Sequence, residues 1–144
     1  MRYGRRGERI VDGDLFRRLV VARDFIGAYH AEPLPLATIA RQAGVSPFHF
    51  LRLYRQVFAV TPHEQQTRFR LERARALLAH GQASVTEVCF AVGYQSLGSF
   101  STLFTRRTGR SPARFQREVR TLVQVPAALA WLYIPCSFLP TAAL

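Results

Sequence analysis

The side chains with the most evident chemistry in this sequence are its arginines. All twenty basic residues are Arg, none is Lys, and the formal net charge is +11. A guanidinium group is planar and always charged, so it can pair with phosphate oxygens or with the O6 and N7 atoms of guanine. Much of the positive charge falls in residues 41–75 and 106–120. Such a charge favours nucleic acid as a partner, with a membrane surface as the second candidate, although we attribute the preference for Arg over Lys to a GC-rich genome.

The sequence gives little support for a disulfide framework, a metal site or a catalytic site. Cys89 and Cys136 form neither a disulfide framework nor a zinc pattern, and both lie in apolar surroundings, which predicts buried free thiols. His49 and His63 stand near predicted helix starts and are interpreted as polar residues there rather than metal ligands. The sequence has no glycine-rich phosphate loop and no nucleophile–base motif. We therefore expect no metal, no cofactor and no enzymatic activity.

The apolar residues recur with helical spacing along most of the chain. In the first predicted helix the inward stripe is expected to end at Tyr29, and Asp12 or Asp14 is expected to cap its start. Thr61 and Ser84 begin capping boxes, each with Glu three residues later. Helices are predicted over 14–30, 36–43, 47–58, 62–79, 85–92, 95–108 and 112–120. In the helix over 62–79, Arg68, Arg70, Arg73 and Arg75 are expected on the sides away from the apolar face.

One pattern occurs twice. Residues 43–62 read AGVSPFHFLRLYRQVFAVTP and residues 92–112 read VGYQSLGSFSTLFTRRTGRSP. Each has a short helix before it, a glycine for the turn, a longer helix with aromatic residues four apart, and a final Ser/Thr-Pro. A short helix, a tight turn and a longer helix make a helix-turn-helix. Two copies with a basic excess beside each make a chance match improbable.

At these residues the sequence resembles the DNA-binding domain of the AraC/XylS family of bacterial transcription regulators. The resemblance covers about residues 15–117; residues 92–112 match the family's signature, and RLERARALL (70–78) matches its linker helix. It implies an all-α, seven-helix, homeodomain-like fold whose two helix-turn-helix subdomains read successive major-groove segments. The expected segments are a basic N-terminal arm (1–13), a first helix-turn-helix subdomain (14–61), a linker helix (62–80), a second subdomain (81–120) and an apolar, Pro-containing tail (121–144).

The resemblance also implies which residues contact DNA. The expected base-reading positions are Phe48, Leu51, Arg52 and Arg55 in the first unit, and Leu97, Gly98, Ser99, Thr102 and Arg106 in the second. The full DNA-binding set adds Ser46, His49, Gln95, Arg107 and Arg110. Arg52 is the strongest candidate for a bidentate contact to guanine. Phosphate contact remains the alternative for Arg52 and Arg55, and partial burial the alternative for Phe48 and Leu51.

Three features depart from the family pattern. Ala59 stands where Gly commonly follows the first recognition helix, Pro35 replaces a Ser-type cap, and Gln65 and Gln66 replace apolar residues of the linker. Ala in a left-handed cap costs on the order of 1 kcal/mol. We expect these changes to weaken the first unit and its seating on the linker helix without changing the fold.

The two ends give different expectations. Only about thirteen residues precede the first predicted helix, so no effector-sensing domain is evident, and the chain is either a stand-alone regulator or part of a longer protein. The tail has no charged residue, but Pro126, Pro135 and Pro140 argue against a membrane span. A tail packed on the helical domain, or exposed to a partner, fits better.

The sequence thus predicts a cytoplasmic, sequence-specific regulator that binds double-stranded DNA, with RNA polymerase as a candidate second partner. Two alternatives stay open: a non-specific architectural nucleic-acid-binding protein, and a protein-interaction module that uses the tail.

Overall fold

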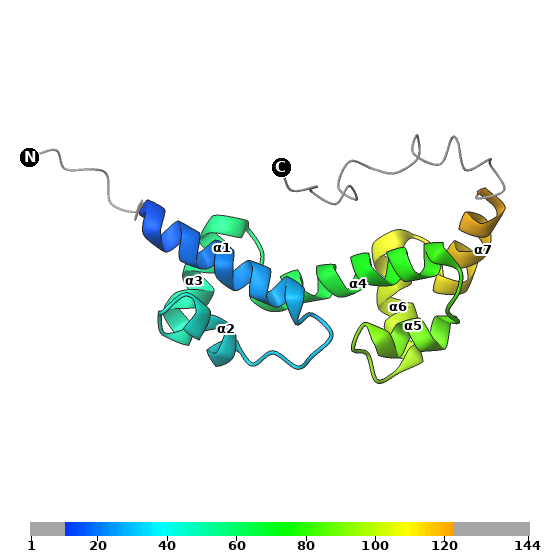
Figure 1. The fold of residues 1–144 in the computed structure, drawn as a ribbon, viewed down its shortest axis with the longest axis horizontal. Coiled ribbons are helices and arrows are strands. Elements are labelled where there is room, and N and C mark those ends of the chain that lie inside the picture. The colour runs from blue at the N-terminus through cyan, green and yellow to red at the C-terminus, as the bar shows by residue number, and fades with distance from the viewer. Residues whose placement is uncertain (1–10, 123–144) are drawn as a thin grey trace, which may run out of the picture.

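The computed structural model describes residues 11–122, which form seven helices and no strand (Figure 1). The helices are α1 (Gly13–Ala28), α2 (Leu36–Gln42), α3 (Pro47–Phe58), α4 (Pro62–His80), α5 (Val85–Ala91), α6 (Leu97–Thr108) and α7 (Pro112–Leu122). The predicted all-α fold is confirmed. The expectations for residues 1–10, for the tail from 123 to 144 and for Cys136 lie outside the described residues. None of the helices within 11–122 has the length and apolar character needed to cross a membrane.

The helices begin where the sequence predicts them to begin. Asp12 caps α1 by accepting from the Leu15 N–H at 2.7 Å. Capping boxes open α4 and α5: the Thr61 and Ser84 N–H groups donate to Glu64 and Glu87, each at 2.7 Å. These backbone hydrogen bonds favour the ionised carboxylates, so the pKa values of Glu64 and Glu87 lie below the ordinary value.

The end of α1 differs from the prediction. The helix stops at Ala28, and Tyr29 is its C-cap, 45% exposed instead of buried in the core. The Tyr29 ring packs on Phe25 on the outer surface, with 4.7 Å between ring centroids. The helical stripe overestimates the helix because the chain leaves the helical path two residues earlier, ahead of the proline-containing loop that leads to α2. As expected, Pro35 gives α2 no side-chain cap.

Two separate apolar cores hold the helices together. The first joins α1, α2 and α3 around Leu19, Ile26, Phe50 and Tyr54, which are all fully buried. The second joins α4, α5 and α6, and its buried residues are Leu71, Ala74, Leu78, Val88, Cys89, Val92, Phe100 and Phe104. Each helix-turn-helix therefore has its own core, and α4 connects the two.

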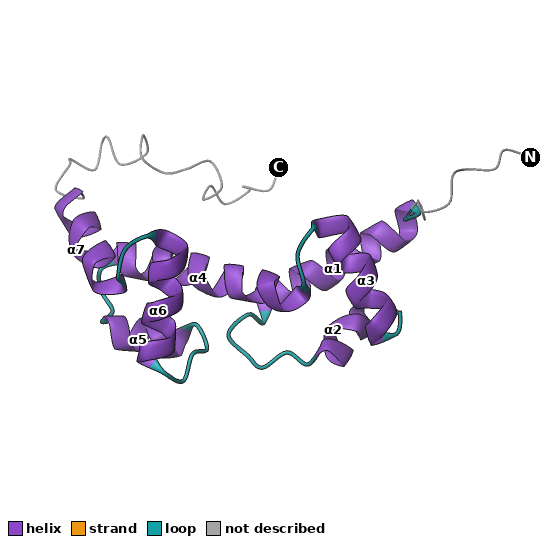
Figure 2. Cartoon of the chain, turned by 180° about the vertical axis from the view of Figure 1, so that it is seen from behind, coloured by secondary structure: helices purple, strands orange, loops and turns teal. Residues whose placement is uncertain are grey.

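Figures 1 and 2 show the two helix-turn-helix units at opposite ends of α4. Its nineteen residues correspond to about 28 Å at 1.5 Å per residue. Phe69 packs against the first core, while Leu71, Ala74 and Leu78 belong to the second. One rigid helix thus determines how far apart the two units lie.

The polar residues near the middle of α4 correct two expectations. Gln66, expected to weaken the seating of the first unit, is buried and donates to the carbonyls of His30 at 3.1 Å and Glu32 at 2.7 Å. Arg70, expected on an outer side of the helix, is half-buried and donates to three backbone carbonyls. Gln66 therefore attaches the first unit to α4 through hydrogen bonds in place of apolar contact.

Ala59 and Gly109 follow the two longer helices and both have positive φ, 57° and 76°. A Cβ atom at Gly109 would meet nothing within 4 Å, so the strain of Gly109→Ala comes from the backbone alone. We expect Gly109→Ala to lower the free energy of unfolding by about 1 kcal/mol, and Ala59→Gly to leave it unchanged or raise it by up to about 1 kcal/mol. Chemical denaturation of both variants tests this, and a more stable Gly109→Ala protein would contradict it.

Candidate nucleic-acid interface

The first helix-turn-helix is built around Gly44. Its φ of +64° provides the left-handed turn between α2 and α3, and Arg18 of α1 braces the turn by donating to the Ala43 carbonyl at 2.8 Å. Ser46 then caps α3 by accepting from the His49 N–H at 3.4 Å, with Pro47 in the first turn of the helix. These contacts determine which face of α3 is turned away from the core.

The outward face of α3 carries the residues proposed to read bases. Phe48 is 91% exposed, an unusual position for a large aromatic side chain. Arg52 and Arg55 are exposed, while His49 and Leu51 are half-buried. Arg52 takes part in no ion pair within residues 11–122, so its guanidinium is available to a ligand.

The second unit repeats this construction with different chemistry. Gly93 has a φ of +88°, and Ser96 caps α6 by accepting from the Ser99 N–H at 3.3 Å. Phe100 and Phe104 point into the core and leave small and hydroxyl side chains outside. An open groove of about 470 Å³ along α6 is lined by Gly98, Ser99, Thr102, Leu103 and Arg106.

The remaining candidates of the second unit lie around this groove. Gln95 is exposed before the helix begins, and Leu97 is 40% exposed in its first turn. Arg106 and Arg107 stand exposed in the last turn. The structure therefore brings four of the predicted residues together in one groove: Gly98, Ser99, Thr102 and Arg106. Leu103 also lines it and was not predicted, because its helical position points mainly toward the core.

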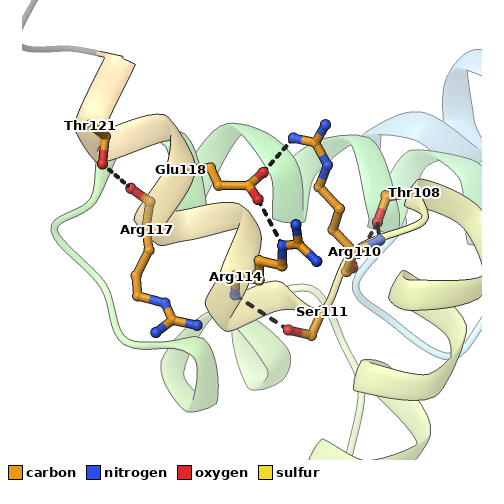
Figure 3. A network of polar contacts seen from close by, with 7 residues as sticks. All are labelled: Thr108, Arg110, Ser111, Arg114, Arg117, Glu118 and Thr121. Atoms are coloured by element: carbon orange, nitrogen blue, oxygen red, sulfur yellow. Dashed lines mark hydrogen bonds and ion pairs between the residues drawn. The ribbon is translucent and has the colours of Figure 1, made fainter.

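Arg110 lies in the turn between α6 and α7 and has an acidic partner. Figure 3 shows Glu118 of α7 between the guanidinium groups of Arg110 and Arg114, with Arg114 Nε 2.7 Å from Glu118 Oε1. The hydrogen bond from Arg114 and the nearby positive charges hold the pKa of Glu118 below its ordinary value. All three side chains remain partly exposed. A phosphate at Arg110 would therefore compete with a carboxylate.

The Cys89 thiol lies in the core of the second unit and away from the groove along α6. Cys89 is a buried free thiol, as predicted, and burial raises the pKa of its thiol. Its Sγ lies 3.8 Å from the Tyr94 carbonyl. Within residues 11–122, no three His, Cys, Asp or Glu side chains gather in a way that could hold a metal ion.

Gln66 and Arg70, which were not predicted as site residues, influence the interface through the loops that they hold. They lie four positions apart on α4 and hold loops of the protein rather than a ligand. For Gln66 the sequence holds a partial signal, because a polar residue stands where the family pattern has an apolar one. Arg70 shows no such local signal, because its partners lie 23 to 40 residues away.

Comparisons with known proteins agree with this geometry. A family model described as a helix-turn-helix domain matches residues 39–118. The probable transcriptional regulator LumQ of Photobacterium leiognathi is 29% identical over 102 residues, which are 71% of this chain and 41% of that protein. The transcriptional activator RhaS of Escherichia coli O139:H28 is 34% identical over 95 residues, 66% of this chain and 34% of RhaS.

A solved structure gives the same result at the level of the fold. A transcriptional regulator from Chromobacterium violaceum, described as an AraC-type DNA-binding-domain protein, superposes with a TM-score of 0.68 at 27% identity. The match covers 75% of this chain and 96% of that one. The chain thus spans less than half the length of LumQ and RhaS, but it matches nearly all of the solved Chromobacterium violaceum chain.

The ion pairs of Glu118 lead to a prediction. Glu118→Gln removes one negative charge and releases Arg110 and Arg114 for phosphate, so DNA of any sequence should bind more tightly. The slope of log K against log salt should steepen by about 1. Fluorescence anisotropy titrations at several salt concentrations measure both quantities.

The control is Glu72→Gln, which removes the same charge from an exposed carboxylate of α4 that forms no ion pair within residues 11–122. Equal effects of the two variants would show that Arg110 and Arg114 do not contact DNA.

Proposed function

Because the chain belongs to the AraC/XylS family of transcription regulators and has its double helix-turn-helix domain, we propose that it binds double-stranded DNA sequence-specifically and regulates transcription. The observation that carries the proposal is the placement of two exposed recognition helices, α3 and α6, in units at opposite ends of one linker helix. The major groove returns to the same face of B-DNA every ~34 Å. The length of α4, about 28 Å, suits two recognition helices that enter successive major-groove segments.

The two units are proposed to divide the work of recognition. Phe48, Leu51, Arg52 and Arg55 of α3 would read bases in one groove segment, and Leu97, Gly98, Ser99, Thr102 and Arg106 in the next. Ser46, His49 and Gln95, near the helix starts, would contact phosphates or adjacent base edges. Arg107 and Arg110 would hold the backbone. Phosphate contacts position a protein on DNA, and base contacts specify the site.

The wider role follows from the family and is part of the proposal. The relatives described above are named as transcription regulators, and DNA recognition of this kind needs no catalytic residue. We propose a non-enzymatic regulator that acts in the bacterial cytoplasm, where its DNA is, with RNA polymerase as a further partner. We assign it no cofactor.

Affinity should depend steeply on salt. With about six to ten phosphate contacts, it should fall by about 10³–10⁵ between 50 and 200 mM salt. The motivation is the concentration of exposed arginines on and beside α3 and α6. Titrations of a duplex selected from a random pool give the slope, and a slope near zero would exclude DNA as the partner.

Arg52 should carry sequence preference. Arg52→Ala should cost about 1–3 kcal/mol on the selected duplex and relax the preference at one or two base pairs. The control is Arg68→Ala, an exposed arginine of α4, which should weaken all sequences alike or have no effect. A base-by-base substitution scan with each variant makes the comparison. An unchanged preference in Arg52→Ala would reassign Arg52 to phosphate, and equal binding of selected and random duplexes by the wild type would favour the architectural alternative.

A further inference from the structure

Within residues 11–122, the two helix-turn-helix units touch each other directly at a point away from their shared linker helix. A Cβ atom placed on Gly93 would lie 2.1 Å from the Ala31 carbonyl oxygen, a distance that no real Cβ atom shows. Ala31 belongs to the loop after α1 and Gly93 to the turn between α5 and α6. In Figures 1 and 2 this loop approaches that turn below α4. The backbones of the two units are thus in direct contact.

Arg70 bonds both sides of this contact. Its Nε donates to the His30 carbonyl at 2.6 Å, one terminal nitrogen to Glu32 at 3.1 Å, and the other to Gly93 at 3.2 Å. The guanidinium also lies over the Tyr94 ring, 5.3 Å from its centroid. The planar fork of Arg can bond several acceptors in fixed directions, which a Lys ammonium cannot do. Arg70 therefore joins the first unit to the second through one rigid group.

Gln66 supports the first-unit side. It donates to the His30 and Glu32 carbonyls and lies one helical turn before Arg70. Since these carbonyls face the middle of α4, removal of Arg70 leaves the first-unit loop attached through Gln66 but leaves the Gly93 carbonyl without this donor. The loss would affect mainly the relation between the units.

We propose that Arg70 and the Ala31–Gly93 contact form a lock that fixes the distance and rotation between α3 and α6, and thereby sets the spacing between the two half-sites in DNA. Arg70 is then a positioning residue for recognition and not a DNA contact. This proposal rests on the proposed function. Without the lock, the units are joined by α4 alone, at the stretch where its contacts pass from one core to the other.

A fixed arrangement of the two units makes binding sensitive to the distance and the rotation between the two DNA half-sites. Each inserted base pair moves one half-site by about 3.4 Å and turns it by roughly 34–36°. A locked protein cannot engage both halves of such a site. It then loses the gain from simultaneous engagement, which is on the order of 10²-fold or more. A protein without the lock can bend or twist to follow the second half.

The first test compares Arg70→Ala with Arg73→Ala, which removes the same charge from an exposed position of α4. Affinities are measured for the selected duplex and for duplexes with one base pair inserted or deleted between the halves. The wild type and Arg73→Ala should lose on the order of 10²-fold on the altered duplexes. Arg70→Ala should bind the selected duplex several-fold more weakly and lose less than about tenfold on the altered ones. The same large loss in all three proteins would overturn the lock.

A second pair separates the contact from backbone strain. Gly93→Ala and Gly109→Ala both place Ala at positive φ, 88° and 76°, but only Gly93→Ala adds a collision with Ala31. Spacing tolerance should change in Gly93→Ala and stay as in the wild type in Gly109→Ala. Equal tolerance in the two folded variants would overturn the role of the contact, and circular dichroism melts show whether each is folded.

A measurement without DNA keeps the lock separate from the proposed function. Spin labels at Ala37→Cys of α2 and Thr86→Cys of α5, both exposed, report the distance between the units in a Cys136→Ser background that keeps the buried Cys89. The distance distribution should broaden in Arg70→Ala and not in Arg73→Ala. An unchanged distribution in Arg70→Ala would refute the lock whatever the DNA results. A broadened distribution in a protein that prefers no DNA sequence would keep the lock and refute the function.

Discussion

The described structure depends on α4, because one helix must pack against two cores at once. Its residues from Leu71 onward contribute to the second core, and its first half is attached to the first unit by Phe69 and Gln66. A helix has a fixed rise and rotation per residue, so the faces used by the two cores determine how α3 and α6 are oriented relative to each other. The same nineteen residues of α4 therefore contribute to the stability of each unit and determine the distance and rotation between the two units.

The departures from the family pattern show how such a helix tolerates change. Gln66 replaces an apolar residue, yet it is buried and its amide donates to the His30 and Glu32 carbonyls, which also accept from Arg70. A buried amide is stable only when it is hydrogen-bonded, and this one is. Ala59 is different, since its left-handed backbone donates to the Arg55 carbonyl at 2.9 Å, a bond that Gly would make equally well without the strain of a Cβ atom. The first unit therefore retains local backbone strain at Ala59, and the packing of its aromatic and aliphatic core offsets this unfavourable free energy.

Much of this fold could be predicted from the sequence, because its signals are local. The caps at Asp12, Thr61 and Ser84 and the left-handed glycines act over three or four residues, and they mark the helix starts and turns directly. The outward face of α3 follows from helical periodicity. The direction of Tyr29 does not, because the helix ends before the apolar stripe does. The partners of Arg70 and of Glu118 are likewise beyond local patterns, since they come together only when separate elements pack. The sequence predicts well where the helices begin and which face of a helix points outward. It predicts poorly which residues of other elements a side chain contacts.

The missing side chain at Gly93 has a consequence for how such domains can be recombined. In the turn of the second unit, residue 93 must lack a side chain, because the Ala31 carbonyl of the first unit occupies the space of a Cβ atom. A chimera that exchanges one helix-turn-helix for that of a relative must therefore keep the loop at 30–32, the middle of α4 and residue 93 together as one inherited block. Cuts within α4 or between that loop and α4 would join halves that each fold but meet with a gap or a collision. The natural exchange unit of this protein is thus the pair of units with their helix, although each unit has a core of its own.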